Sequence, residues 1–151
     1  TYLSRRLGYS WDDVHDEAER LEHAASDELI DRMAAALEHP REDPHGDPIP
    51  TRSGQVDATP RTLLSELDRE MRVVIRAVRD DDPERLRAME SRGLLPGVTL
   101  WVEARPARGS PLTVRVGGRE GPGQALGPQL AGRIWVTVPP EPGVDGRGAP
   151  A

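Results

Sequence analysis

Length, composition and charge exclude several classes of protein. A chain of 151 residues has room for one ordinary domain or two small ones, and without cysteine it has no disulfide, thiolate metal site or thiol nucleophile. The formal net charge of -6 gives no general electrostatic basis for binding nucleic acid, which requires clustered Lys and Arg.

The ends of the sequence and its hydropathy bear on where it acts. No apolar run approaches the roughly 20 residues that cross a bilayer, and the N-terminus lacks the order of a signal peptide. We therefore expect a cytoplasmic protein without membrane contact. Because the sequence opens at Thr1 rather than at a methionine, we expect it to begin partway through a longer product.

The first 40 residues have helical patterns. Residues 1–7 resemble the end of a helix that stops at Gly8. A second helix is predicted from Trp11, with Ser10 as its N-cap and apolar residues at steps of four and three: Val14, Ala18, Leu21 and Ala25.

A third helix is predicted from Ser26, with a stripe made of Leu29, Ile30, Met33 and Leu37. Two helices with such narrow apolar stripes bury them poorly alone, so we expect a homodimer that forms through them.

After residue 40, turn residues and runs with strand composition largely replace the apolar spacing of helices. Residues 40–62 form a turn-rich connector with five prolines. Strands are predicted at 71–78, 98–104, 112–118 and 133–138, with a helix at 83–93 after the first of them. This order favours an α+β protein: a helical dimerisation domain (1–45), a linker (46–69), a small SH3-like β-barrel (70–139) and a disordered tail (140–151). Trp101 and Trp135 are expected in the barrel core.

The segment "VHDEAERLEH" concentrates groups that can ligate a metal. His15, Glu19 and Glu22 are separated by four and three residues, which places them on one side of a helix, with His23 beside them. The alternative is a solvated face of ordinary surface charges, with Arg20 near the two glutamates. Crowded like charges next to two histidines favour a cation, and nitrogen and oxygen donors without sulfur suit Mn²⁺ or Fe²⁺.

Motifs for catalysis are missing from the sequence. A di-iron bundle needs Glu-x-x-His on each of two helices, but here Glu19-x-x-Glu22 is followed by His23, and the helix from Ser26 has no matching pair. The zincin motifs, G-x-S-x-G and a P-loop do not occur either. We therefore predict no catalytic residue and no enzyme activity.

"VHDEAERLEHAASDELIDRM" and "HPREDPHGDPIP" together resemble the dimerisation and metal-binding domain of the diphtheria-toxin-repressor-like (DtxR/MntR) metalloregulators. The last 70 residues or so resemble the SH3-like, FeoA-type domain of that family. The resemblance implies Mn²⁺ or Fe²⁺ as cofactor and a metal-activated repressor that binds operator DNA through an N-terminal winged helix outside this chain. No DNA-binding residue is predicted in this segment.

By resemblance, Glu19, Glu22 and His23 match ligands of the principal metal site, and His15 matches a ligand of the neighbouring ancillary site. Glutamate at position 19, where iron-responsive members have cysteine, favours manganese. The winged-helix ligands are absent here, so we expect weak metal binding by this segment alone. In the barrel, Asp82 and Arg85 stand where the family has ancillary ligands, and an arginine cannot ligate a cation.

Two functions remain open at this point. The first is the metal-sensing and dimerisation portion of a Mn²⁺- or Fe²⁺-dependent transcriptional regulator. The second is a cytosolic regulatory extension of a metal-ion transporter that dimerises or senses metal without binding DNA.

Overall fold

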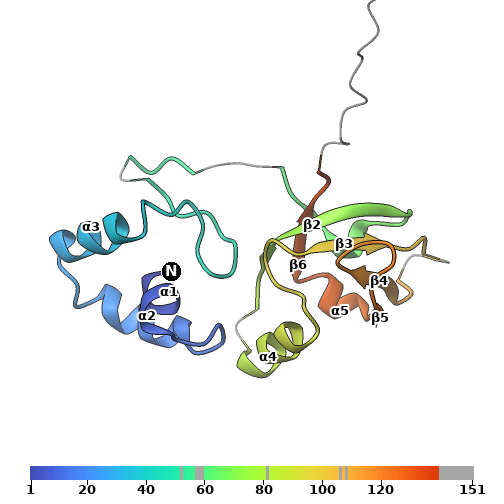
Figure 1. Cartoon of the computed structure of the whole chain (residues 1–151), viewed down its shortest axis with the longest axis horizontal. Coiled ribbons are helices and arrows are strands. Elements are labelled where there is room, and N and C mark those ends of the chain that lie inside the picture. The colour runs from blue at the N-terminus through green and yellow to red at the C-terminus, as the bar shows by residue number, and fades with distance from the viewer. Residues whose placement is uncertain (52, 57–59, 81, 106, 108, 140–151) are drawn as a thin grey trace, which may run out of the picture.

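The chain has two parts, a helical one and one built on a sheet (Figure 1). This computed structural model describes residues 1–51, 53–56, 60–80, 82–105, 107 and 109–139. The first part contains three helices and the second an antiparallel sheet with two further helices. The predicted α+β class is therefore confirmed. The predicted disordered tail, 140–151, lies outside the described residues.

Three helices form the N-terminal part: α1 (Tyr2–Leu7), α2 (Val14–Glu22) and α3 (Asp27–Ala36). Helix α1 ends at Gly8, whose φ of 75° lies in the left-handed region that glycine adopts without steric cost. Helix α3 begins after Ser26, whose hydroxyl accepts a hydrogen bond from the amide of Leu29 at 3.3 Å. Both boundaries agree with the sequence prediction.

The start of α2 differs from the prediction. The helix begins at Val14 with Asp13 at the N-cap position, not at Trp11 with Ser10 as the cap. The Ser10 hydroxyl lies 2.8 Å from the carboxylate of Asp13, to which it donates. Trp11 and Asp12 are buried in the turn that precedes the helix. Local capping rules miss this turn because both side chains pack against distant parts of the sequence.

The apolar stripe of α3 is not covered by the described part of the chain. Leu29 and Ile30 are 42% and 43% exposed, and no residue of α3 is buried. Ile30, Met33 and Leu37 line a groove of about 950 Å³ beside the segment that follows the helix. Large apolar side chains exposed together on one face are typical of an interaction surface.

Six strands form one antiparallel sheet in the order β1-β6-β2-β3-β4-β5. Four of them lie in the predicted runs: β2 (Met71–Val78), β3 (Thr99–Val102), β4 (Leu112–Val116) and β6 (Ile134–Thr137). The other two, β1 (Thr62–Leu63) and β5 (Gly123–Leu126), are short, and β5 lacks the β-branched residues that mark a strand. The sheet begins at Thr62, inside the range predicted as a linker.

Helices α4 (Pro83–Ser91) and α5 (Pro128–Ala131) and the 3-10 turn η1 (Leu64–Glu66) complete the second part. Asp82 caps α4, because its carboxylate accepts hydrogen bonds from the amides of Glu84 and Arg85. Sheet and helices enclose one core, and each fully buried Leu or Ile in it contributes about 2 kcal/mol of apolar burial. The largest fully buried side chains in it are Leu64, Ile75, Met89, Leu94, Leu100, Leu112, Leu126 and Ile134.

Trp101 and Trp135 are not core residues, so that prediction is wrong. Both are only partly buried, because they alternate with the buried side chains of β3 and β6. The guanidinium of Arg119 lies 5.1 Å from the ring of Trp101, and that of Arg79 lies 5.6 Å from the ring of Trp135. Arginines cover these rings in place of core packing.

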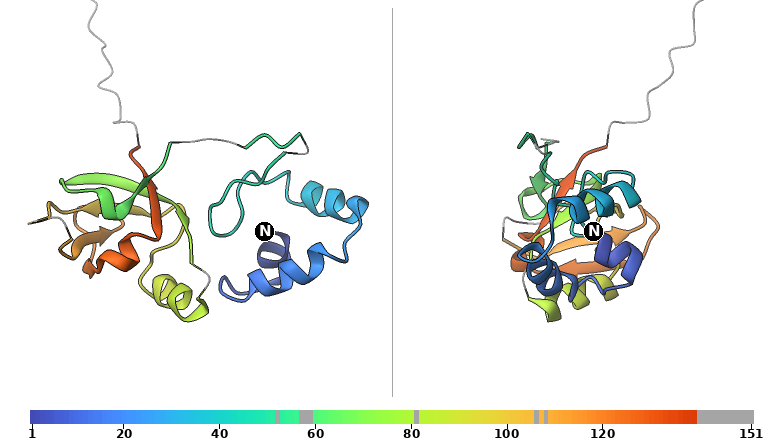
Figure 2. Two further views of the ribbon diagram at one scale, coloured as in Figure 1. Left: turned by 180° about the vertical axis from the view of Figure 1, so that it is seen from behind. Right: turned by 90° about the vertical axis from the view of Figure 1, so that its left-hand side faces the viewer.

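The segment 41–48 lies between the two parts and contacts β2 (Figure 2). The amide of Val78 donates to the carbonyl of His45 at 2.9 Å. Gly46 is buried with a φ of 86°, and a Cβ at this position would overlap the carbonyl oxygen of Arg76. The connector predicted at 40–62 thus includes a packed turn, which holds the helical part against the sheet.

Candidate metal centre

The four predicted metal ligands lie on α2 and at its C-terminal end. His15, Glu19 and Glu22 are in the helix, and His23 is the C-cap residue with helical φ and ψ. The helical spacing places Glu19 and Glu22 one turn apart, with His23 next to Glu22. All four side chains are exposed.

None of these four side chains has a hydrogen bond or ion pair with another residue in the described part of the chain. Arg20, the nearest arginine in sequence, pairs with Glu17 at 3.4 Å instead. Glu19 and Glu22 thus have no basic partner on their own helix, and two like charges one turn apart are mildly unfavourable.

The donor chemistry fits a hard divalent cation, but the ligand set is incomplete. Carboxylate oxygens and imidazole nitrogens suit Mn²⁺ and Fe²⁺. Within the described residues, however, no group of three or more His, Asp and Glu side chains converges to hold a metal ion. One face of α2 alone does not surround a cation, so a closed site would need ligands from elsewhere.

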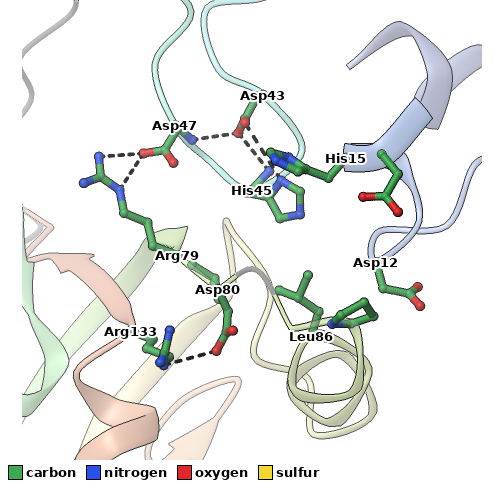
Figure 3. Close-up of a pocket in the computed structure, with 12 residues that line it drawn as sticks. Asp12, His15, Asp43, His45, Asp47, Arg79, Asp80, Leu86 and Arg133 are labelled. Atoms are coloured by element: carbon green, nitrogen blue, oxygen red, sulfur yellow. Dashed lines mark hydrogen bonds and ion pairs between the residues drawn. The ribbon is translucent and has the colours of Figure 1, made fainter. Parts of the chain in front are cut away.

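The structure separates His15 from the other predicted ligands. His15 lines a cavity of about 420 Å³ between the helical part and the sheet (Figure 3). Glu22 instead lines an apolar pocket of about 230 Å³ among α1, α2 and α3. The two ends of α2 therefore face different surroundings.

The cavity that His15 lines is mostly acidic. Asp12 and Asp16 come from the α2 region, Asp43 and Asp47 from the segment 41–48, and Asp80 from the end of β2. Arg79 and Arg133 enter it from the sheet side. The sequence prediction missed these carboxylates because they come from three distant segments.

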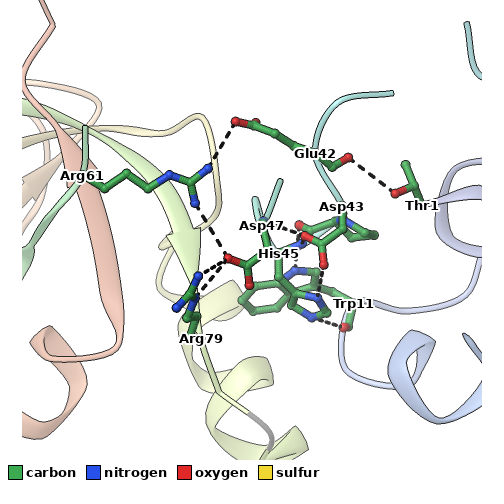
Figure 4. Close-up of polar contacts among 9 residues, drawn as sticks. Thr1, Trp11, Glu42, Asp43, His45, Asp47, Arg61 and Arg79 are labelled. Atoms are coloured by element: carbon green, nitrogen blue, oxygen red, sulfur yellow. Dashed lines mark hydrogen bonds and ion pairs between the residues drawn. The ribbon is translucent and has the colours of Figure 1, made fainter. Parts of the chain in front are cut away.

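Asp43 is the centre of the turn between the two parts (Figure 4). Its carboxylate accepts hydrogen bonds from the amides of His45 and Asp47, at 2.9 and 2.8 Å. Burial opposes ionisation, but these bonds and the side chain of His45 outweigh it and lower the pKa of Asp43 below its ordinary value. Asp43 therefore stabilises the turn as a carboxylate and has few lone pairs left for a metal.

His45 fastens that turn to the start of α2. Its ring lies 5.2 Å from the ring of Trp11, centroid to centroid, and its Nε2 lies 3.1 Å from the Trp11 carbonyl oxygen. A carbonyl only accepts, so Nε2 carries the hydrogen. Trp11 in turn donates from its indole nitrogen to the carbonyl of Pro44 at 3.1 Å. Through these contacts His45 packs the turn against the start of α2.

In the sheet part, the two residues that the resemblance aligns with ancillary ligands, Asp82 and Arg85, have structural contacts. Asp82 caps α4, and Arg85 forms ion pairs with Asp80 and Asp82, at 2.8 and 2.9 Å. The Asp80 side chain has no exposed surface and also contacts Arg133 at 3.2 Å. Burial alone would raise the pKa of Asp80. The hydrogen bonds from Arg85 and from the amide of Asp82, with the positive charges of Arg133 and Arg85, outweigh burial and hold the pKa below its ordinary value.

Comparisons with known protein families match both parts. Residues 1–51 match the metal-binding and dimerisation domain of iron-dependent repressors, and residues 62–138 match the FeoA domain. No helix in the described residues is long and apolar enough to span a membrane.

Individual relatives are also repressors. The chain is 30% identical to the iron-dependent repressor IdeR of Mycobacterium leprae over 113 residues, which are 67% of this chain and 49% of that protein. A solved manganese-dependent transcriptional repressor in complex with manganese superposes with a TM-score of 0.84 and 41% identity, covering 91% of this chain and 64% of that one. A second structure of a manganese-dependent transcriptional repressor superposes with a TM-score of 0.81 and 40% identity, covering 91% of this chain and 75% of that one. The chain spans about half the length of the curated relatives it matches.

Proposed function

Because the chain belongs to the diphtheria-toxin-repressor-like family of metal-dependent transcriptional regulators, we propose that it is the metal-sensing and dimerisation portion of a repressor activated by Mn²⁺ or Fe²⁺. The family consists of transcriptional repressors, not enzymes. The relatives support this function and not the transporter alternative.

The observation that carries the proposal is the acidic face of α2. Glu19, Glu22 and His23 are exposed and have no protein partner in the described residues, so they are free to ligate a cation. They form the principal site of our proposal, and His15 belongs to the neighbouring one. We favour manganese because Glu19 supplies a hard oxygen donor where cysteine would supply a soft sulfur.

The partners of the proposed regulator are a second copy of this chain and operator DNA. The exposed stripe of Leu29 and Ile30 on α3 is the proposed dimer contact. DNA would be bound by an N-terminal domain outside these 151 residues, which is consistent with the greater length of the relatives.

In this proposal, metal binding and DNA binding are linked. A bound cation supplies positive charge that neutralises Glu19 and Glu22, and ligands from the N-terminal domain complete the site. Metal shifts the DNA-binding equilibrium only by the ratio of its affinities for the competent and incompetent arrangements.

The test uses the longer protein that carries this segment, with Mn²⁺ titrated in the presence of operator DNA. Glu22→Ala should abolish metal-dependent retention of DNA, because it removes an anionic ligand from the helix face. Glu19→Cys should move the metal preference toward softer ions. Sedimentation should show a dimer in both variants, since neither residue lies on the α3 stripe.

Arg20→Ala is the matched control on the same helix, because Arg20 pairs with Glu17 and not with the proposed ligands. It should leave retention unchanged. Retention by Glu22→Ala at the wild-type level would refute the site, and a monomeric wild-type protein would refute the dimer.

A further inference from the structure

The two parts of the chain carry opposite net charge. Residues 1–60 contain 6 arginines and 14 acidic residues, a net charge of -8, whereas residues 61–138 contain 13 arginines and 10 acidic residues, a net charge of +3. The overall charge of -6 therefore combines an acidic part, which contains the metal-binding domain, and a basic part, which contains the FeoA domain. Such an asymmetry favours docking of one on the other.

The ion pairs between the two domains follow this asymmetry. In each of these pairs in the described residues, the segment 1–60 supplies the carboxylate and the segment 61–138 supplies the guanidinium. The pairs are Glu42 with Arg61 and Arg76, Asp47 with Arg61 and Arg79, and Asp12 with Arg87. Figure 4 shows those that Arg61 and Arg79 form with the segment 41–48.

The pair between Asp12 and Arg87 differs from the others in burial and position. The side chain of Asp12 is only 5% exposed, while Glu42 and Asp47 are about one-third exposed. The distance from Asp12 Oδ2 to the Arg87 guanidinium is 2.9 Å. A carboxylate this buried is costly to leave unpaired, whereas the exposed pairs contribute little.

Asp12 also lies at the start of the metal-binding helix. It precedes α2 by two residues, is adjacent to Trp11, and lines the same cavity as His15. Arg87 is on α4 of the FeoA domain, 75 residues away in sequence. This contact therefore joins α4 to the turn that immediately precedes α2.

We propose that Arg87 is a positioning residue through which the FeoA domain holds the metal-binding helix, so that docking of this domain and metal binding on α2 favour each other. The coupling rests on the proposed function, whereas the docking role of Arg87 does not. By linkage, the factor by which docking raises metal affinity equals the factor by which metal strengthens docking.

The effect on the ligands acts through the position of α2 rather than through the charge of Arg87. Helix α2 rises about 1.5 Å per residue, so Glu22 lies more than about 12 Å along the axis from Asp12. That distance exceeds the Debye length of about 8 Å at physiological ionic strength. Removal of the Arg87 charge alone would barely change the potential at Glu22.

The amide of Val78 reports docking directly, because it donates to His45 of the N-terminal domain. The amide of Ile75 reports folding of the FeoA domain, because it donates to the carbonyl of Val98 inside that domain. Hydrogen exchange at these two amides separates loss of docking from loss of folding.

The experiment measures Val78 and Ile75 exchange in the 151-residue chain, and Mn²⁺ binding through the EPR signal of the free ion. In Arg87→Ala, Val78 exchange should accelerate about tenfold and the Mn²⁺ dissociation constant should rise about fivefold, with Ile75 unchanged. For Arg87→Lys, both the Val78 exchange rate and the Mn²⁺ dissociation constant should lie between those of Arg87→Ala and the wild type. Arg119→Ala is the control, because it removes the same charge from a pair with Glu70 inside the FeoA domain and should change neither quantity.

Unchanged Val78 exchange in Arg87→Ala would overturn the proposal, and so would accelerated exchange with an unchanged Mn²⁺ dissociation constant. If the wild-type 151-residue chain bound no Mn²⁺, the coupling would fail, whereas the proposed function is tested separately by metal-dependent DNA retention in the longer protein. Accelerated Val78 exchange would in that case still support the docking role of Arg87.

Discussion

Asp80 is the residue whose ionisation has most structural consequence in the FeoA domain. Its side chain is fully covered and contacts both Arg85 and Arg133. Because its pKa in the folded protein is below the ordinary value of 3.8, the ionised form stabilises the fold. That contribution is complete above the unfolded pKa and is lost as the pH falls through the folded pKa. The pKa of Asp43 is also lowered in the folded protein, so its ionised form stabilises the fold in the same way.

Asp80→Asn should lower the free energy of unfolding by about 1 to 3 kcal/mol at neutral pH, because two guanidiniums lose a charged acceptor. It should also flatten the decline in stability below about pH 4, since the titrating group is gone. Urea unfolding at a series of pH values measures both effects. Glu90→Gln, which removes an exposed carboxylate from α4, should do neither. An equally steep acid decline in Asp80→Asn would contradict this role.

Single residues could be predicted from the sequence where their function depends on near neighbours. Ser26 caps α3 and Gly8 ends α1 through bonds within a few residues, which local rules describe. Asp12 could not, because its partner is Arg87 and the pattern around it resembles an ordinary first helical turn. For Trp101 and Trp135, the strand runs indicate an apolar stretch but not which face of the sheet each ring lies on.

At the scale of elements, the segment 41–48 determines how the two domains meet. Glycine is required at position 46 for two reasons: its φ is positive, and the backbone of Arg76 leaves no space for a Cβ. Gly54 also has a positive φ, of 77°, but has nothing within 4 Å. A comparison of substitutions at Gly46 and Gly54 therefore distinguishes the effect of a positive φ from the effect of a clash with the Arg76 backbone.

Gly46→Ala should accelerate exchange at the Val78 amide strongly, because the turn must move away from β2 to relieve the overlap. Gly54→Ala carries the same type of backbone strain, about 1 kcal/mol, and should leave Val78 exchange near the wild-type rate. Equal exchange rates in the two variants would show that close packing of this turn does not hold the domains together.

The longer elements were predictable and the shorter ones were not. The strand at 71–78 agrees with β2, and the helix predicted at 83–93 contains α4, because both have regular apolar patterns and clear ends. Strand β5 and helix α5 have four residues each and begin with Gly123 and Pro128. Strand β5 is regular through its pairing with β4, and Ala131 of α5 is buried, so tertiary contacts and not local propensity determine both elements.

At the scale of the whole molecule, the proposed metal site depends on how the parts of the chain are arranged in three dimensions. The predicted ligands follow from the helical spacing on α2, but the absence of a convergent ligand group in the described residues does not. That absence depends on three-dimensional closure, which spacing along one helix cannot provide. The predicted domain limits, including the linker 46–69, stay a prediction.

The most direct test of the central claim locates the cation on the chain. Mn²⁺ is paramagnetic, so it broadens the NMR signals of amides near the ion. We expect broadening centred on Glu19, Glu22 and His23 of the 151-residue chain, reversed by a chelator and lost in the double variant Glu19→Gln, Glu22→Gln. Broadening spread evenly over the acidic surface of the N-terminal domain, or unchanged in the double variant, would contradict the account.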